Sequence, residues 1–239
     1  MLDEGFIEVI APVADTTRTR QMRERMTQYA GVHLACFGTA AATEERERLA
    51  RQGFDPLRLI EHAREVDVNG KASVAHYRVV HVRHDRMPEG RIEYVEHLTP
   101  DLLWQSRWLA HANGVTGLAA LFVVAEDVPA ASARWMRFSG LSANAAGPFL
   151  RVQAARGEVL IGRRADWEAV LSASPPGPAL AGYMLACGDP VMLGARLEAL
   201  GCAVRQVSHG LWASLLPAAL GGAWLFGARE SLSGFLQES

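Results

Sequence analysis

Pro88-Glu89-Gly90-Arg91-Ile92-Glu93-Tyr94-Val95 closely repeats the opening stretch of the chain, Asp3-Glu4-Gly5-Phe6-Ile7-Glu8-Val9-Ile10. Each copy has a glycine suited to a turn, followed by residues of high β propensity. In both copies an acidic side chain stands third after the glycine, where burial is costly unless the carboxylate is paired or bound. The repeat therefore predicts two equivalent strands that carry equivalent carboxylates, Glu8 and Glu93.

A larger pattern recurs around these stretches, in which a short apolar strand precedes a capped helix and a glycine stands where the helix stops. The strands are at residues 32–37, 117–124 and 181–187, and an Asp and a Pro open the last two helices. Strand-like segments follow each helix, starting with residues 57–60 after the first, so the chain is predicted to hold three β-α-β-β-β units. Residues 15–29, which are charged, are predicted to form a helix that leads into the first complete unit. The fourth strand of the middle unit is not evident. Residues 6–10 are interpreted as the last strand of a further, truncated unit.

The pattern predicts two halves joined by a connecting helix. Residues 1–98 form the first half, with the last strand of the truncated unit and one complete unit. Residues 99–115 form the connecting helix, and residues 116–239 form the second half, with two units. Because native sheets rarely leave such a strand uncovered, residues 6–10 predict either a longer natural protein, with Met1 internal to it, or a second chain that completes the unit.

Composition excludes several classes of function. The 239 residues include 24 Lys and Arg against 26 Asp and Glu, so no basic excess indicates a nucleic-acid partner. No apolar run reaches about 18 residues and no signal peptide opens the chain, so we expect a cytoplasmic protein without membrane contact. The phosphate-binding glycine motifs are missing, which gives no support to a nucleotide cofactor. Three widely spaced cysteines predict buried free thiols.

The repeated β-α-β-β-β units, the Gly-x-Ile-Glu stretch at residues 90–93 and the histidine in Val32-His33-Leu34 resemble the vicinal oxygen chelate superfamily. In particular, the chain looks like the glyoxalase-like domain proteins of that superfamily, over nearly its whole length. The resemblance implies an α+β fold in which paired β-α-β-β-β units form curved mixed sheets, with the first unit truncated in this sequence. It also implies a small-molecule ligand and a divalent metal, held by first-strand histidines and fourth-strand glutamates.

Carried over residue by residue, the resemblance assigns Glu8, His33 and Glu93 as metal ligands. Imidazole and carboxylate groups suit a divalent ion that keeps open positions for substrate oxygens. Such an ion acts as a Lewis acid on a carbonyl or an enediolate. The alternative is a buried, hydrogen-bonded histidine with two carboxylates that face solvent.

Strand alternation limits the candidate catalytic residues. Glu93 and His97 lie on one side of a strand, and Tyr94 and Glu96 lie on the other. If Glu93 faces the ligand, His97 is a second catalytic candidate, able to exchange protons near neutral pH. If the other side faces the ligand, Glu96 is the relevant carboxylate. A turn position without chemistry is the alternative for His97.

The resemblance implies metal-assisted isomerase, lyase or dioxygenase chemistry on a small oxygenated substrate. Metal-free binding of a small molecule, of the drug-sequestering type found in the same superfamily, is the alternative, and a scaffold without ligand is a third class. The first strands of the second half carry no histidine, so any metal is expected in the first half. Trp212 and Trp224 are expected to be mostly buried. The uncovered strand at residues 6–10 predicts a homodimer or other self-association.

Overall fold

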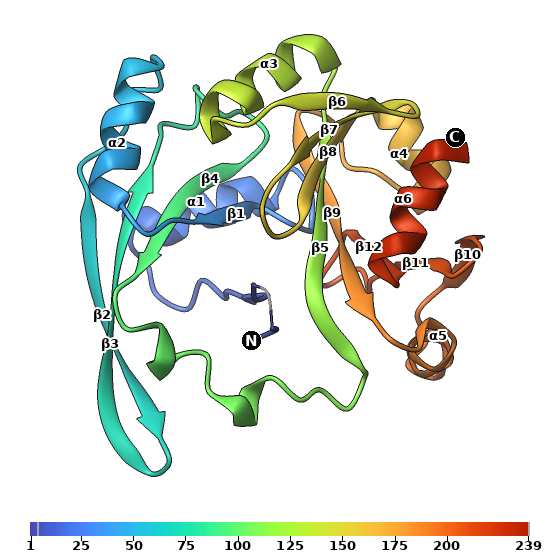
Figure 1. Ribbon diagram of the computed structural model, residues 1–239, viewed down its shortest axis with the longest axis horizontal. Coiled ribbons are helices and arrows are strands. Elements are labelled where there is room, and N and C mark those ends of the chain that lie inside the picture. Colours follow the sequence, from blue (N-terminus) through green and yellow to red (C-terminus); the bar gives the residue numbers. More distant parts are fainter. Residues whose placement is uncertain (4, 239) are drawn as a thin grey trace.

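The computed structural model describes residues 1–3 and 5–238 (Figure 1). Three β-α-β-β-β units follow one another along the chain and build a four-stranded and an eight-stranded sheet. The α+β class and the mixed sheets of β-α-β-β-β units are therefore confirmed. Across the described part of the chain, no helix has both the length and the apolar character needed to cross a membrane.

The first unit forms the four-stranded sheet by itself. Its strands lie in the order β1-β4-β3-β2, with β1 and β4 parallel and the other neighbours antiparallel. The elements are β1 (Leu34–Gly38), α2 (Ala42–Arg51), β2 (Ile60–Val68), β3 (Lys71–His81) and β4 (Arg91–His97).

The second and third units share the eight-stranded sheet, in the order β10-β11-β12-β9-β5-β8-β7-β6. Their first strands, β5 and β9, pair antiparallel and join the two units. The second unit contains β5 (Val115–Val124), α3 (Val128–Ser139), β6 (Ala143–Ala146), β7 (Phe149–Gln153) and β8 (Glu158–Gly162). The third contains β9 (Ala179–Cys187), α5 (Pro190–Ala199), β10 (Val204–Ser208), β11 (Leu211–Leu215) and β12 (Ala223–Gly227).

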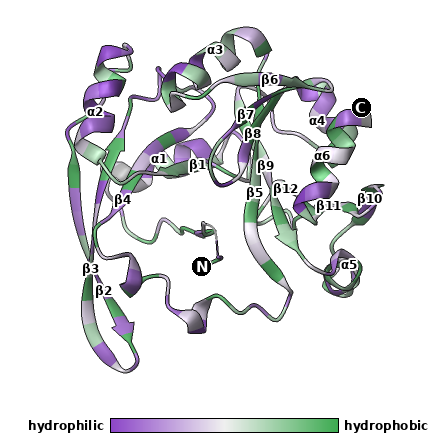
Figure 2. Cartoon of the chain, in the orientation of Figure 1, coloured by the Kyte–Doolittle hydropathy of each residue, from purple (hydrophilic) through white to green (hydrophobic). Residues whose placement is uncertain are grey.

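The remaining elements lie before, between and after the units. They are the helices α1 (Thr17–Met26), α4 (Arg164–Leu171) and α6 (Arg229–Glu238), and the 3₁₀ turns η1 (Pro100–Leu102) and η2 (Ser106–Trp108). Figure 2 shows that β5 is largely hydrophobic whereas α2 is hydrophilic over much of its surface. This contrast fits a strand buried at the centre of the molecule and a helix that faces solvent on one side.

The helix after the first strand of each unit covers one face of its sheet. Leu49 of α2 and Trp135 of α3 are buried in one core with Ile92 and Tyr94 of β4. Leu193 of α5 belongs to a second core, on the third unit. We call the faces covered by these three helices the outer faces.

The opposite face of the eight-stranded sheet is filled by α4 and α6. Trp167 of α4 and Leu232 of α6 are buried in the same core as Phe122, Leu160 and Leu225 of the strands. The corresponding face of the four-stranded sheet has no such helix among the described residues, and the N-terminal segment lies over it (Figure 1).

Two predictions in the first half of the chain are wrong. Residues 6–10 form no strand, because no neighbouring strand offers them a hydrogen-bonding ladder. The predicted connecting helix is replaced by η1 and η2. Thr99 does not cap this helix, because its hydroxyl accepts a hydrogen bond from the His76 amide of β3 at 2.8 Å instead.

Strand positions differ in two further places. The strand missing from the predicted middle unit is β6, whose sequence Ala143-Asn144-Ala145-Ala146 has low β propensity and so gave no strand signal. The strand predicted at residues 57–60 lies further along, at β2. The helix predicted within residues 15–29 is confirmed as α1.

Candidate functional site

The two faces of the four-stranded sheet differ in chemistry. Ile92 and Tyr94 of β4 point to the outer face, where they meet α2 and α3. Alternation therefore places Arg91, Glu93 and His97 on the opposite face, which we call the inner face.

Glu96 belongs to the outer face. Its Oε2 accepts a hydrogen bond from the Ala42 amide, at the start of α2, at 3.2 Å. The same oxygen lies 3.8 Å from Arg78. Glu96 thus serves the helix terminus, and Glu93 is the carboxylate of β4 that faces inward.

A polar row crosses the inner face at the level of Glu93. The strand register pairs Glu93 with Cys36 of β1 and with His81 of β3. The Cys36 thiol donates to Glu93 Oε1 at 3.4 Å, and Arg91 Nε lies 2.6 Å from Glu93 Oε2. Glu93 is only 6% exposed, so these two partners compensate the burial of its carboxylate.

Cys36 is exposed, contrary to the buried thiol expected from the sequence. Desolvation by the surrounding protein, followed by the Glu93 carboxylate, nevertheless raises the pKa of Cys36 well above its usual value. A thiol with so high a pKa acts as a hydrogen-bond donor to Glu93 rather than as a nucleophile.

The N-terminal segment, residues 5–13, lies over the inner face without forming a strand (Figure 1). The Phe6 ring meets His97 and Trp104 edge to face, at centroid distances of 6.2 and 6.1 Å. Glu8 is exposed, and its charge adds to the pKa rise of Cys36 after the larger effects of desolvation and Glu93. Glu8 and Glu93 therefore both act on one thiol, although they do not occupy equivalent strands.

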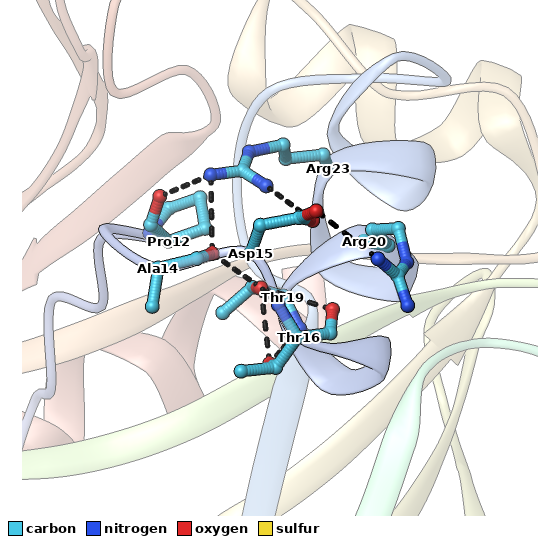
Figure 3. A network of polar contacts seen from close by, with 7 residues as sticks. All are labelled: Pro12, Ala14, Asp15, Thr16, Thr19, Arg20 and Arg23. Atoms are coloured by element: carbon cyan, nitrogen blue, oxygen red, sulfur yellow. Dashed lines mark hydrogen bonds and ion pairs between the residues drawn. The ribbon is translucent and has the colours of Figure 1, made fainter.

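The N-terminal segment is anchored at both ends. The Asp3 amide donates to the Thr116 carbonyl at 2.9 Å. At the other end, Arg23 of α1 donates to the Pro12 carbonyl at 2.8 Å (Figure 3). Between these anchors Val9 is 81% exposed, so the middle of the segment is held mainly by its Phe6 ring contacts. The network at the second anchor also includes Ala14, Asp15, Thr16, Thr19 and Arg20.

His33 lies apart from the polar row. Its Nε2 is 3.0 Å from the Tyr29 carbonyl oxygen, and its ring stacks on Tyr29 with centroids 4.3 Å apart. Burial lowers the pKa of His33. His33 stands three residues before Cys36 in extended chain, so the two side chains point in opposite directions. The structure does not bring His33 together with Glu93.

His97 lies on the inner face within an aromatic cluster. Its ring centroid is 5.0 Å from that of Trp104 and 6.1 Å from that of Tyr77, and Phe6 closes a third side. Burial lowers the pKa of His97, so the imidazole is neutral at pH 7. Its buried Nδ1 makes no hydrogen bond to any residue the structure describes.

The resemblance noted in the sequence implies a divalent metal, and the predicted ligands can be compared with what such an ion needs. Within residues 1–3 and 5–238, no group of three or more His, Cys, Asp or Glu side chains converges as a metal site requires. Glu93 is paired with Arg91, and His33 is bonded to Tyr29. In this arrangement the donor set does not fit a divalent ion, and metal ligation by Glu8, His33 and Glu93 stays a prediction.

The other two units show what these positions carry in a closed core. The strand register pairs Phe122 with Leu160 in the second unit and Met184 with Leu225 in the third, at the positions of Cys36 and Glu93. All four residues are buried beneath α4 and α6. Of the three units, only the first therefore carries a polar pair here.

Trp212 and Trp224 lie on the outer face of the third unit. Both pack against the core of α5 and neither is exposed, in line with the expectation that they are mostly buried. Tyr183 accompanies Trp224 at a centroid distance of 5.8 Å. Neither tryptophan takes part in the inner face of the first unit.

Sequence reasoning missed Cys36, His81 and Arg91 as members of the site. The missing information was the register between strands, which no single strand contains. Pairing Leu34 with Arg91, the residue after Gly90, places Cys36 beside Glu93. Parallel pairing of a unit's first and last strands was therefore the usable signal.

Comparison with known families and structures agrees with this fold. A family profile described as a glyoxalase-like domain matches residues 1–138. No curated protein sequence matches the chain.

Two solved structures have TM-scores just above one half. A hypothetical protein from Staphylococcus aureus has a TM-score of 0.53 at 6% identity, covering 81% of this chain and 64% of that one. The Mn(II)-bound glyoxalase from Novosphingobium aromaticivorans has a TM-score of 0.52 at 10% identity, covering 83% of this chain and 63% of that one. The chain thus spans less than two thirds of the length of either protein. At these identities the likeness shows the fold alone.

Proposed function

Because the chain belongs to the glyoxalase-like domain family, we propose that it binds a small oxygenated molecule on the inner face of its first unit. The observation that carries this proposal is the pair of Cys36 and Glu93, which replaces the buried apolar pairs of the other units. A carboxylate is retained there beneath a segment held chiefly at its ends. Retaining a buried charge without a structural need is typical of a functional site.

Within this site we propose Glu93 as the group that accepts a proton from carbon next to a carbonyl. His97 lies four residues after Glu93 on the same face of β4, and its neutral imidazole is the second polar group of that face. Such proton abstraction corresponds to the isomerase-type chemistry expected from the sequence. Lyase or dioxygenase chemistry with a metal on Glu8, His33 and Glu93 would require these side chains to rearrange.

Binding without chemistry is the second candidate. The aromatic side chains of Phe6, Tyr77 and Trp104 surround His97, and aromatic walls of this kind hold a ligand by apolar contact. This observation favours a metal-free binding protein of the drug-sequestering type.

Deuterium exchange separates these candidates. The protein is incubated with an α-hydroxy ketone in D₂O, and loss of the α-proton signal is followed by ¹H NMR, with EDTA and with added Mn²⁺. We expect exchange with wild type and a loss of about a hundredfold or more in Glu93→Gln. Glu96→Gln is the matched control on the same strand, and it should exchange like wild type.

Each other outcome has a defined meaning. Exchange that needs Mn²⁺ supports the metal-ligand prediction instead of the metal-free arrangement. Saturable ligand-induced stabilisation without exchange supports the binding protein. Neither exchange nor binding, over a panel of small oxygenated compounds, would contradict the proposed function.

We also propose that the chain self-associates through β1. The corresponding strands of the other units, β5 and β9, pair antiparallel with each other, whereas β1 ends its sheet. Just before β1, an isolated bridge pairs Val32 with Leu180 of β9. A second copy that pairs its β1 with this one would extend the sheet as β5 and β9 do.

A further inference from the structure

Side chains on the inner face change in character along the strands. The polar row that contains Glu93 lies at one end. Two residues further along, Val79 of β3 pairs with Val95 of β4, and both are buried. Two residues beyond these, Tyr77 pairs with His97. The inner face therefore carries a polar row, an apolar row and a row of rings, in that order.

The row of rings is continued by neighbouring elements. His62 of β2 pairs with Tyr77 and stacks on it, with centroids 5.1 Å apart. Trp104, between η1 and η2, stands edge to face with His97 at 5.0 Å. Each of these four rings is only partly buried, and none belongs to the three cores that the structure describes. We call Tyr77, His97 and Trp104 the ring cluster.

Phe6 supplies a further ring to this cluster from the N-terminal segment, which lies over the inner face (Figure 1). Its ring meets His97 at 6.2 Å and Trp104 at 6.1 Å, both edge to face. Phe6 itself stays partly exposed. The chain turns toward the cluster at Gly5, whose φ of +86° favours glycine. Phe6 therefore rests on other rings outside any core.

Little else holds the segment in this position. In the part of the chain that the structure describes, the backbone of residues 6–11 makes no hydrogen bond. Ile7, Val9 and Ile10 are exposed, at 42%, 81% and 41%. Segments with few buried apolar contacts and no backbone hydrogen bonds open locally with ease. Another ring could thus replace Phe6 without breaking any backbone hydrogen bond.

We propose that the ring cluster binds an aromatic ring of the small molecule, and that Phe6 competes with this ring for the same contacts. The inference rests on the proposed function and names its substrate class: an aromatic compound whose oxygenated carbon is joined to the ring by a chain. The oxygenated carbon lies at the polar row, the chain lies over the apolar row, and the ring lies against the ring cluster. Glu93 and His97 are four residues apart along a strand, about 13 Å, so the ligand is elongated.

Calorimetric titration with two α-hydroxy ketones tests this ring site. One is 1-hydroxy-6-phenylhexan-2-one, and the other is 1-hydroxyoctan-2-one, which has no ring. We expect the phenyl ketone to bind wild type about tenfold more tightly, because ring–ring contacts add to apolar contact. Trp104→Leu should remove most of that preference. Trp108→Leu is the matched control, since Trp108 is 50% exposed and contacts Arg107 instead of the ring cluster.

A second variant guards against a folding defect in Trp104→Leu. Tyr77→Leu removes another ring of the cluster from a different element, and it should reduce the preference for the phenyl ketone as well. Equal affinity of wild type for the two ketones, or an unchanged preference in both variants, would overturn the proposal.

Phe6→Ala tests the competition. Removing the competing ring should tighten binding of the phenyl ketone about threefold or more, because the fraction of molecules able to bind it rises. Val9→Ala lies in the same segment but changes an exposed side chain, so it should bind like wild type. Unchanged or weaker binding by Phe6→Ala would show that Phe6 is not a competitor and would overturn this part of the proposal.

The ring site and the proposed function can fail separately. If wild type prefers the phenyl ketone and Trp104→Leu does not, but no α-proton exchanges, the ring site stands and the proposed chemistry of Glu93 fails. If exchange depends on Glu93 but the two ketones bind and exchange alike, only the ring site fails.

Discussion

Glu93 makes the inner face of the first unit polar. A carboxylate at 6% exposure is costly to bury alone, and the guanidinium of Arg91 and the thiol of Cys36 offset that cost. Leu160 and Leu225 occupy the equivalent positions without needing any polar partner. The first unit thus keeps a charged group where the fold could have used leucine.

Alkylation of Cys36 measures the contact with Glu93. Replacing Glu93 by Gln removes the negative charge that, after desolvation, raises the pKa of the thiol. The thiolate fraction at pH 8 then rises, and reaction with iodoacetamide at Cys36 should be several-fold faster, as followed by peptide mass spectrometry. Glu96→Gln should leave the rate unchanged. An unchanged rate in Glu93→Gln would show that the two side chains do not interact.

His97 links stability to pH. Burial lowers its pKa in the folded state below the unfolded value of about 6.5. Below that pH the unfolded chain takes up a proton more readily, so stability present above about pH 6.5 is lost as pH falls. His33 and His84 are shifted in the same direction and share this effect.

We therefore expect the free energy of unfolding to fall between pH 7 and pH 5, and to fall less in His97→Phe than in wild type. Urea denaturation at the two pH values measures the difference. The exposed His76 offers a control, since His76→Phe should keep the wild-type pH dependence. An identical fall in His97→Phe and wild type would contradict the burial of the imidazole.

Elements differ in how far the sequence could predict them. The start of α3 was predictable, because Asp127 caps it through the Ala130 amide at 2.9 Å and Val128-Pro129 follows. The cap of α2 was not, because Glu96 supplies it from another element. For the same reason the sequence left open whether Glu93 or Glu96 faces the ligand, since packing of α2 decides it.

The site residues, like the helices and strands, were predictable where local sequence was enough and unpredictable where a distant strand decides. The third position after Gly90 carries Glu93, a carboxylate that the structure buries on the inner face. The partner on β1 was predicted as His33, but the register places Leu34 opposite Arg91 and therefore Cys36 opposite Glu93. A shift of this kind reverses the face of every side chain, and only the paired strand fixes it.

A buried ion pair joins α3 to the turn before β4. Glu89 is 1% exposed and pairs with Arg134 of α3. Arg134→Met leaves the carboxylate buried without a partner, so we expect a loss of about 3–5 kcal/mol in the free energy of unfolding, measured with urea. The double variant Glu89→Met with Arg134→Met should recover most of that loss. A single variant as stable as wild type would mean that this pair does not hold the two units together.

The two sheets differ in what covers the face opposite the outer helices. In the second half, α4 and α6 fill the face opposite α3 and α5, and the residues there are apolar and buried. In the first half, that face carries polar groups and is covered by the N-terminal segment, whose middle is exposed. This difference favours the first unit for the proposed ligand site, although all three units share one topology.

At the scale of the whole molecule, we predict that the chain self-associates through β1. An edge strand such as β1 offers unpaired backbone groups that favour pairing with another chain. Sedimentation velocity over a wide concentration range should therefore show dimers that increase with concentration. A monomer at every concentration would show that β1 is protected in another way.

We propose the inner face of the first unit as the small-molecule site. Backbone amide NMR with increasing lactate locates a bound ligand, because each non-proline amide reports on its own surroundings. We expect saturable shifts at Cys36, Arg91 and Glu93, together with Phe6 in the segment above them. Saturable shifts confined to the second half of the chain, or none at concentrations where binding is measured, would contradict it.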